Sequence, residues 1–314
     1  MKISIIIVNW NSGTQLFEAV NSISKYHCGI VALVVIVDNG SIDGSLKYIE
    51  NLNSFPFEIH IIRNMLNYGF GVACNQGAAL AKSELILFLN PDTKIFENSL
   101  TVPLSFFNNP QNKNVGIVGI QLVDEKNKVT QSCSRFPSPK IFLTQALGLN
   151  RLLVFKHLTQ FMVDWDHSTT KEVNQVMGAF LMIRQPLFKT LGGFDERFFV
   201  YFEEVDLSYR AHRAGWKSVY LSDAKTYHAG NGTSNQVKAK RLFYSLRSRI
   251  LFCNKHFSKI NTFIVALITV FIEPISRSSL SIYKKDLLSL KETWSAYFML
   301  YKWLPKWITT GVTR

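Results

Sequence analysis

Five short apolar runs, rich in β-branched residues, recur through the first 120 residues. Apolar runs of this length are typical of strands that are buried on both faces, as in a parallel sheet. Helix-compatible stretches separate them, and this alternation predicts an α/β fold with a doubly wound, mostly parallel sheet flanked by helices. The expected strands cover residues 3–8, 33–37, 59–62, 85–89 and 115–120, and the expected helices cover residues 15–26, 45–51 and 71–81.

The chain is less regular beyond residue 123. Residues 124–175 are rich in turn-forming and aromatic residues, which indicates a loop-rich insertion able to shape a binding cleft. A strand is expected over residues 176–183, a short helix from Pro186, and a last strand over residues 216–221. The length of 314 residues suits one large α/β domain with an appendage, or two small domains.

Positive charge is concentrated in the C-terminal part of the chain. The net charge is +13, and residues 231–314 alone hold 14 Lys and Arg against 3 Asp and Glu. Such an asymmetry indicates an anionic partner, either nucleic acid or acidic lipid. Apolar residues recur at helical spacing over residues 237–257, between basic ones, which predicts a basic amphipathic helix. Tryptophans and tyrosines among lysines over residues 294–307 are typical of a membrane interface.

Cysteine spacing and the length of the apolar runs indicate the compartment. Four cysteines lie far apart without a Cys-x-x-Cys pair, so we expect neither a disulfide framework nor a zinc site, and a reducing compartment fits best. The N-terminal apolar stretch is short and has no small-residue cleavage site, so no signal peptide is expected. The longest later apolar run, residues 263–272, is shorter than the roughly 20 residues that a membrane-spanning helix needs.

Polar residues follow three of the expected strands. Asn9 follows the first strand, Asp38 the second, and Asn90-Pro91-Asp92 the fourth. Ligands of doubly wound sheets bind at the carboxyl ends of the strands, where these side chains would gather. Asp92 is placed to supply an oxygen ligand to a hard divalent cation, such as one that offsets the charge of a nucleoside diphosphate. Taken alone, an Asp after a strand is more often a turn former or a helix cap.

A glycine-containing segment, residues 67–77, follows the third expected strand. Gly69 and Gly71 allow close backbone approach at a helix start, which suits a ribose or a phosphate. The segment lacks the Gly-x-Gly-x-x-Gly pattern, because Cys74 occupies the third glycine position, and it does not follow the first strand. Both features count against a nicotinamide-dependent oxidoreductase.

Two later segments carry groups suited to acid–base or metal chemistry. Glu203, Glu204 and Asp206 lie in an aromatic, apolar stretch. A carboxylate in apolar surroundings has a raised proton affinity, which suits a general base, although the same acids would also favour a helix start. His228 follows the last expected strand and precedes glycines. Such a histidine can bind a metal or a phosphate, although a lone histidine is more often structural.

These segments, in this order and spacing, resemble the family 2 glycosyltransferases of the GT-A fold. The resemblance covers residues 3–234 and is closest to the bacterial rhamnosyltransferase-like branch that builds O-antigen and capsule polysaccharides. It implies a GT-A catalytic domain over residues 1–234, with a nucleotide-binding half at about 1–122 and an acceptor half at about 123–234. Residues 235–314 would then form a basic amphipathic helical tail that associates with a membrane.

The resemblance also implies roles for individual residues. Asp38 would recognise the nucleoside base, and Asp92 would bind a divalent metal, Mg²⁺ or Mn²⁺, as the metal-binding acid of an Asp-x-Asp motif whose first position is here Asn90. Glu204 would be the catalytic base, one methylene longer than the usual Asp, and His228 would contact the metal or the diphosphate. Donor binding is further implied for Val8, Asn9, Asn67, Gly69, Asn75, Asn90, Gly178 and Ala179, and acceptor contact for Glu203.

The activity implied by this resemblance is that of an inverting hexosyltransferase. It would move a sugar, favoured as L-rhamnose from dTDP-L-rhamnose, to a polyprenyl-diphosphate-linked saccharide, with UDP-hexose and UDP-HexNAc donors left open. The protein would be cytoplasmic and peripheral on the inner face of the cell membrane, with its tail bound to acidic lipid.

Three other classes of protein are alternatives to a glycosyltransferase. A nucleotidyltransferase would carry basic residues in a Gly-rich loop after the first strand, and residues 9–13 hold none. A nucleic-acid-binding protein without activity would use the basic tail, but the apolar face and the tryptophans fit a membrane better, so no nucleic-acid partner is expected. A catalytically inactive relative stays open because Asn90 and Glu204 depart from the family pattern.

Overall fold

The computed structural model describes residues 1–51, 55–230 and 238–313. The chain divides into two compact units, which we name the sheet unit (residues 1–134, 165–195 and 204–233) and the helical unit (residues 135–164, 196–203 and 234–314). The boundary expected at residue 234 lies outside the described residues. Residues 135–164 and 196–203 group with the C-terminal helices, so the expected acceptor half is divided between the two units.

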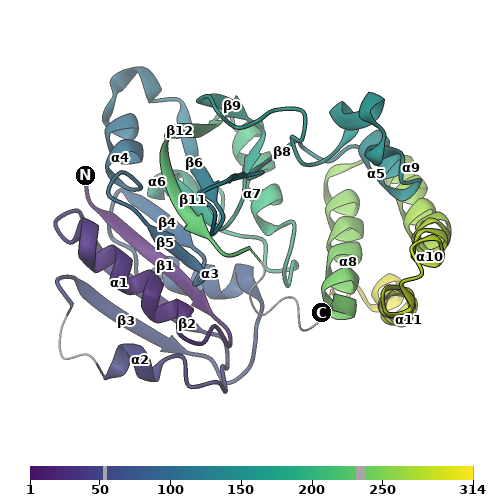
Figure 1. Ribbon diagram of the computed structural model, residues 1–314, viewed down its shortest axis with the longest axis horizontal. Coiled ribbons are helices and arrows are strands. Elements are labelled where there is room, and N and C mark those ends of the chain that lie inside the picture. The colour runs from purple at the N-terminus through teal and green to yellow at the C-terminus, as the bar shows by residue number, and fades with distance from the viewer. Residues whose placement is uncertain (52–54, 231–237, 314) are drawn as a thin grey trace. The chain divides into compact units, whose positions relative to one another are not determined.

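The first half of the sheet unit has the expected βαβ topology. Four strands lie in the order β3-β2-β1-β4, and all three neighbouring pairs are parallel. The register places Asn9 opposite Asp38 and Ile7 opposite Leu89, so the carboxyl ends of the strands meet at one edge (Figure 1). The elements are β1 (Ile3–Asn9), α1 (Gln15–His27), β2 (Val31–Asp38), α2 (Lys47–Glu50), β3 (Glu58–Arg63), α3 (Phe70–Ala79) and β4 (Leu85–Leu89).

The second half of the sheet is mixed and continues the order as β11-β6-β12-β5. β11 (Phe180–Arg184) is antiparallel to both β4 and β6 (Val115–Val123), and β12 (Lys217–His228) is parallel to β6. β5 (Thr93–Ile95) is antiparallel to the end of β12. Short strands add to the edges: β7 (Val129–Thr130) pairs with β6, β9 (Lys171–Val173) pairs with β12, and β8 (Cys133–Ser134) pairs separately with β10 (Gln175–Val176).

Two strand predictions differ from the structure. The strand expected over 176–183 is two elements, β10 and β11, with residues 177–179 between them. The strand expected over 216–221 continues to His228, because its second part pairs with β5 and with the end of β6. This extension carries His228 to the edge of the sheet that holds the ends of β1, β2 and β4.

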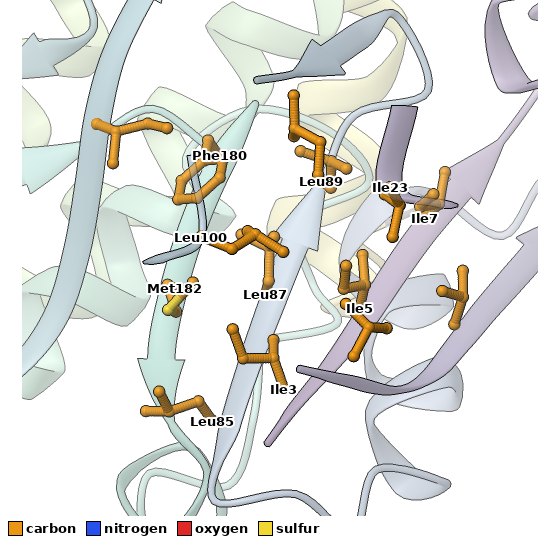
Figure 2. Packing of buried hydrophobic residues seen from close by; sticks show 14 of the residues in the cluster. Ile3, Ile5, Ile7, Ile23, Leu85, Leu87, Leu89, Leu100, Phe180 and Met182 are labelled. Carbon is orange, nitrogen blue, oxygen red and sulfur yellow. The ribbon is translucent and has the colours of Figure 1, made fainter. Parts of the chain in front are cut away.

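The core of the sheet unit forms on both faces of β1. Ile3, Ile5 and Ile7 share one buried cluster with Ile23 of α1, as the labelled side chains in Figure 2 show. On the other face α3 approaches closely, since a Cβ added to its Gly77 would lie 2.5 Å from Cγ2 of Ile6. Helices therefore cover both faces, and the sheet unit has the GT-A arrangement that was expected. The remaining helices of this unit are α4 (Thr101–Asn108), α6 (Gln185–Thr190) and most of α7 (Glu203–Arg213).

The helical unit buries the apolar face of the predicted amphipathic helix. Leu246, Ile250 and Cys253 of α8 are fully enclosed, and α8 packs against α9 and α11. The helix expected over 237–257 is present over 238–256, and residue 237 lies outside the described residues. Residues 246–253 are all buried, Arg247 and Arg249 included, so this part of the helix is enclosed on every side and is not the amphipathic surface that was expected. The helices of this unit are α5 (Pro139–Ala146), α8 (Lys238–His256), α9 (Lys259–Leu267), α10 (Glu273–Tyr283) and α11 (Leu287–Thr310), with a π turn (Ile268–Ile272) between α9 and α10.

The apolar segment near residue 270 is longer than expected. The helix runs without a break from Lys259 to Tyr283, and it is long and apolar enough to cross a membrane by length and composition alone. The expectation that this apolar segment is too short to span a membrane is therefore wrong, as far as its length is concerned. Glu273 does not end the helix because Arg249 and Arg277 bind its carboxylate, and Pro274 lies in the first turn of α10, where proline is tolerated.

Candidate active site

Asp38 is held rigidly at the carboxyl end of β2. Its carboxylate is buried, with Oδ1 accepting a hydrogen bond from Asn9 Nδ2 at 2.7 Å and Oδ2 accepting one from the Ser41 amide at 3.2 Å. Asn9 Nδ2 also donates to Ser45 Oγ at 2.8 Å, and Val8 precedes it at the end of β1. A carboxylate has about four acceptor positions, so Asp38 can still accept a bond from a nucleobase.

The loops after β1 and β2 are tied together by further polar contacts. Asp43 accepts hydrogen bonds from the Ser45 amide at 3.0 Å and the Gly13 amide at 2.7 Å. Partial burial acts to raise the pKa of Asp43, but these hydrogen bonds outweigh it, and the pKa lies below its usual value. Asp43 therefore stays charged and fixes the two loops in one arrangement.

A side-chain amide network leads from this edge to the start of α3. Asn39 Nδ2 donates to the Gly69 carbonyl at 3.1 Å and to Asn67 Oδ1 at 3.3 Å, and Asn67 Oδ1 also accepts from the Gly69 amide at 2.9 Å. Gly69 has φ +86°, a left-handed conformation that glycine adopts without strain. The network orients the N-terminus of α3, where backbone amides and the helix dipole favour a phosphate.

Asn75 connects α3 to the turn that precedes α7. Its Nδ2 donates to the Phe194 carbonyl and its Oδ1 accepts from the Phe194 amide, both at 2.9 Å. A Cβ added to Gly193 would lie 2.6 Å from Asn75 Oδ1. The side chain thus supports the fold at this turn, and its contact with a donor stays a prediction.

Asp92 and His228 come together through the β5–β12 pair. This pairing sets His228 opposite Thr93, and the Ala229 amide donates to the Asp92 carbonyl at 3.0 Å. His228 Nε2 lies 3.4 Å from Asp92 Oδ1, with 12% of each side chain exposed. The two side chains form a largely buried pair that can still reach a ligand.

The start of β11 brings Gly178 and Ala179 to the same edge. The Asn90 amide donates to the Ala179 carbonyl at 3.1 Å, which fixes the turn before Asp92. A Cβ added to Gly178 would lie 3.9 Å from Cγ of Glu204 and 4.0 Å from the ring of Phe70. Gly178 therefore lies between the catalytic candidate Glu204 and the first residue of α3.

Glu204 has the environment of a general base. The residue is partly exposed, yet Oε2 is enclosed and accepts no hydrogen bond from the residues that the structure describes. Burial raises the pKa of Glu204, and the amides of Glu204 and Val205 act in the opposite direction without cancelling the effect. A carboxylate of raised proton affinity is suited to remove a proton near neutral pH.

The chain before Glu204 is strained. Tyr201 and Phe202 have φ values of +69° and +72°, and each such non-glycine residue costs about 1–3 kcal/mol. Strain of this kind clusters at functional sites, because the surrounding structure must hold it in place. The next residue, Glu203, is buried, and its predicted contact with the acceptor is untested.

Asp206 has a structural partner. Its Oδ2 accepts from Arg210 Nε at 2.7 Å, and Arg210 also donates to the carbonyls of Leu191 and Gly193. Asp206 is fully buried in this arrangement, so it holds α7 against the preceding turn.

The donor set fits a cation that is bound together with a diphosphate. Within the described ranges, no group of three or more His, Cys, Asp or Glu side chains is placed to hold a metal. Asp92 and His228 supply one oxygen and one nitrogen donor. Mg²⁺ is commonly bound through one or two carboxylates plus substrate phosphates, so the Asp92 carboxylate meets this requirement, with the His228 imidazole beside it.

Sequence reasoning did not single out several residues of this edge. Ser12 Oγ donates to Asn9 Oδ1, Ser41 and Ser45 bind its Nδ2, and Asn64 Nδ2 donates to Asn39 Oδ1 at 2.9 Å. The only sequence signal was the density of Ser and Asn after two neighbouring strands. Phe70 was missed because an aromatic residue at a helix start is ordinary.

The strand order and the parallel first half of the sheet are those of the GT-A fold, the fold of glycosyltransferases that use nucleotide-sugar donors. A family model described as "Glycosyltransferase like family 2" matches residues 2–245, and the chain belongs to that family.

Similar proteins agree with this assignment. The chain is 27% identical over 266 residues to the low-salt glycan biosynthesis hexosyltransferase Agl10 of Haloferax volcanii, covering 82% of this chain and 77% of that protein. It is 25% identical over 265 residues to the N-acetylglucosaminyl-diphospho-decaprenol L-rhamnosyltransferase of Mycobacterium tuberculosis, covering 79% and 82%. The solved mannosyltransferase PcManGT of Pyrobaculum calidifontis, in complex with GDP-Man and Mn²⁺, shares the fold with a TM-score of 0.55 at 15% identity, covering 99% and 84%.

Proposed function

We propose that this enzyme is an inverting hexosyltransferase that moves L-rhamnose from dTDP-L-rhamnose to a polyprenyl-diphosphate-linked saccharide in cell-surface polysaccharide synthesis. The observation that carries the proposal is the gathering of the Asp92–His228 pair, Gly178 and Glu204 at the sheet edge that holds Asp38. The rhamnosyltransferase relative, whose name gives a decaprenol-linked acceptor, supports the sugar and the acceptor class.

The donor lies along the carboxyl edge in this proposal. Asp38 binds the base, beside Val8, and the fully buried Asn9 positions the Asp38 carboxylate and does not contact the base itself. The N-terminus of α3 at Gly69 binds the diphosphate together with Asn67. Asp92 and His228 would hold a divalent cation, Mg²⁺ or Mn²⁺, which when bound offsets the charge on the leaving nucleoside diphosphate. Asn90, Gly178 and Ala179 line the donor sugar.

Glu204 carries the chemical step. Its carboxylate takes the proton from an acceptor hydroxyl, and the oxygen attacks the anomeric carbon from the face opposite the diphosphate. A new C–O bond forms while the bond to the diphosphate breaks, and the bonding electrons leave with the nucleotide. A single displacement inverts the anomeric configuration and requires no covalent enzyme intermediate. Glu203 contacts the acceptor, and the basic helical unit keeps the enzyme at the inner membrane face, where the lipid-linked acceptor resides.

A panel of donors tests the proposal. The purified protein is incubated with dTDP-L-rhamnose, UDP-glucose, UDP-GlcNAc or GDP-mannose, with Mg²⁺, Mn²⁺ or a chelator, and with a polyprenyl-diphosphate-linked GlcNAc. We expect nucleotide release and a product of one added deoxyhexose by mass spectrometry, only with dTDP-L-rhamnose and only with metal. Preferred use of a UDP-sugar would show that the donor is that sugar and not dTDP-L-rhamnose. Equal turnover in the presence of the chelator would overturn the metal-dependent mechanism.

A further inference from the structure

The continuous helix over residues 259–283 exposes apolar side chains along one face. Most of the exposed positions are three or four residues apart, with one adjacent pair and one interval of seven, which places them in a stripe along one side of the helix. The stripe extends for about 33 Å at the usual helical rise. It consists of Ile260, Phe263, Ile264, Leu267, Phe271, Ile275 and Ile282, and its two aromatic residues, Phe263 and Phe271, are 63% and 62% exposed.

The opposite face of the same helix is packed inside the helical unit. Val265, Ile268 and Val270 are buried, and the helix contacts α5, α8 and α11 (Figure 1). The stripe is therefore exposed apolar surface that does not take part in the core of the helical unit. Single exposed apolar residues are ordinary on a protein, but a contiguous stripe of this length marks an interaction site.

Buried charges argue that this helix does not cross a bilayer. Glu273 is 1% exposed and accepts hydrogen bonds from Arg249 on α8 and from Arg277 one turn later. Arg249 also donates to Thr269 at 3.3 Å. Crossing would carry Glu273 and Arg277 into hydrocarbon or part them from Arg249, and separating a buried ion pair is strongly unfavourable. A helix that lies in the plane of the interface keeps every one of these contacts.

The charge around the stripe selects its partner. Lys259 begins the helix, Lys284 and Lys285 follow it, and all three are exposed. The described residues 238–313 hold only three acids, of which Glu273 is neutralised by its arginines. Apolar surface bordered by lysines is complementary to anionic lipid headgroups over acyl chains. A second copy of this chain would bring the same positive charge, so self-association is disfavoured.

Helix α11 repeats the pattern. Its exposed Trp294, Phe298 and Ile308 lie at helical spacing with Lys291 and Lys302, and Lys302 Nζ is 4.2 Å from the centre of the Phe298 ring. Lysines that extend along aromatic side chains are typical of helices at a bilayer surface.

We propose that the helical unit docks on anionic bilayers through the stripe of residues 260–282, with this helix lying in the plane of the interface. The proposed function explains why the protein would bind a membrane, namely to reach a lipid-borne acceptor. The evidence for the binding surface does not depend on that function.

Vesicle binding of the full chain tests the surface. We measure co-sedimentation with vesicles of phosphatidylglycerol and phosphatidylcholine, and with phosphatidylcholine alone. Phe263→Gln and Phe271→Gln should each weaken binding to the anionic vesicles about tenfold, because each removes a ring from the bilayer. Tyr48→Gln, which changes an exposed aromatic residue of α2 in the sheet unit, is the matched control and should bind normally. Unchanged binding of both stripe variants would overturn the proposal, as would equal binding to uncharged vesicles.

Depth measurement separates an in-plane helix from a crossing one. In a Cys28→Ser background, cysteines are placed at Ile260, Phe271 and Ile282 and labelled with a fluorophore that spin-labelled lipids quench by depth. Equal, shallow depths are expected at all three positions. A central depth at residue 271 with shallow ends would overturn the in-plane arrangement, and a stripe-dependent dimer without vesicles would overturn lipid as the partner.

Activity measurements keep the two proposals apart. Nucleotide release with a water-soluble acceptor fragment should be unchanged in Phe263→Gln and Phe271→Gln. If the protein uses no donor but the stripe variants lose vesicle binding, the proposed function is wrong and the docking surface stands. If the protein uses a donor but the stripe variants bind vesicles normally, the docking surface is wrong and the proposed function stands.

Discussion

Asp92 and His228 meet because the last residues of β12 pair antiparallel with β5, which starts directly after Asp92. The His228 side chain reaches the Asp92 carboxylate at 3.4 Å from the far end of a 12-residue strand. The pair therefore depends on the length of β12, and a shorter strand would leave the acid alone at the edge.

If this pair holds the cation, both members should control metal dependence. Asp92→Asn removes the charge and His228→Asn removes the imidazole, and we expect each to lower kcat/KM at least about 10²-fold and to raise the Mn²⁺ concentration for half-maximal activity. Nucleotide release is measured against Mn²⁺ concentration. Asp223→Asn, an exposed acid on β12, serves as the control. A wild-type metal profile in both site variants would contradict the assignment.

Glu204→Gln should abolish transfer while the fold is retained. The amide keeps the size of the side chain but cannot accept the proton, and general base catalysis typically contributes about 10²–10⁴-fold. Product formation is followed by mass spectrometry, and folding by circular dichroism. Full turnover by this variant would exclude Glu204 as the base, whereas partial activity in Glu204→Asp is compatible with the shorter acid of the family pattern.

The raised pKa of Glu204 also makes a prediction about stability. Because burial raises the folded-state pKa above the unfolded one, the folded state holds more protons between the two values, and stability falls as pH rises through the folded pKa. The Glu204→Gln variant has no titrating carboxyl group at this position, so it does not lose stability in this way as the pH rises. Its Tm should match the wild type at about pH 4 and exceed it at about pH 8. Melting curves across this range check the sign, and a variant that is less stable at high pH would contradict the buried carboxylate.

Much of the fold could be predicted from the sequence, because continuous apolar runs such as residues 3–8 and 85–89 are buried on both faces. The second half of β12 could not, since Ser222 and Asp223 interrupt its apolar pattern and only pairing with β5 and β6 makes it a strand. The helix through Glu273 was missed for a related reason. Its charge is neutralised by Arg249, a contact between distant segments that local sequence does not reveal.

The candidate site shows the same division. The types of residue at the carboxyl edge were predictable, because polar side chains must follow strands that end at a binding edge. The hydrogen-bond partners were not. Asn75 stands in a motif that resembles a donor-binding segment, yet both ends of its amide bind the Phe194 backbone.

This double contact allows the role of Asn75 to be tested. Asn75→Ala removes two hydrogen bonds and leaves the Phe194 amide and carbonyl without their partner, so we expect a loss of about 1–3 kcal/mol in the free energy of unfolding. Urea denaturation measures the loss. The donor KM is measured on the same variant, and a raised KM without loss of stability would favour direct donor contact over the structural role.

Gly178 tests the spacing of the site around Glu204. A Cβ at this position would meet Glu204 Cγ at 3.9 Å and the Phe70 ring at 4.0 Å, which are ordinary contacts, so Gly178→Ala should fold with an unchanged Tm. The added methyl group would occupy space beside the Glu204 carboxylate, where the proposal places the donor sugar. We therefore expect a fall of at least about tenfold in kcat/KM, the size of effect that one methyl group has in a fitted site. Gly148→Ala would be a poor control because its φ of +72° adds strain, whereas Gly29→Ala has open space and no positive φ. Wild-type kinetics in Gly178→Ala, beside wild-type kinetics in Gly29→Ala, would show that the sugar does not lie between Glu204 and Phe70.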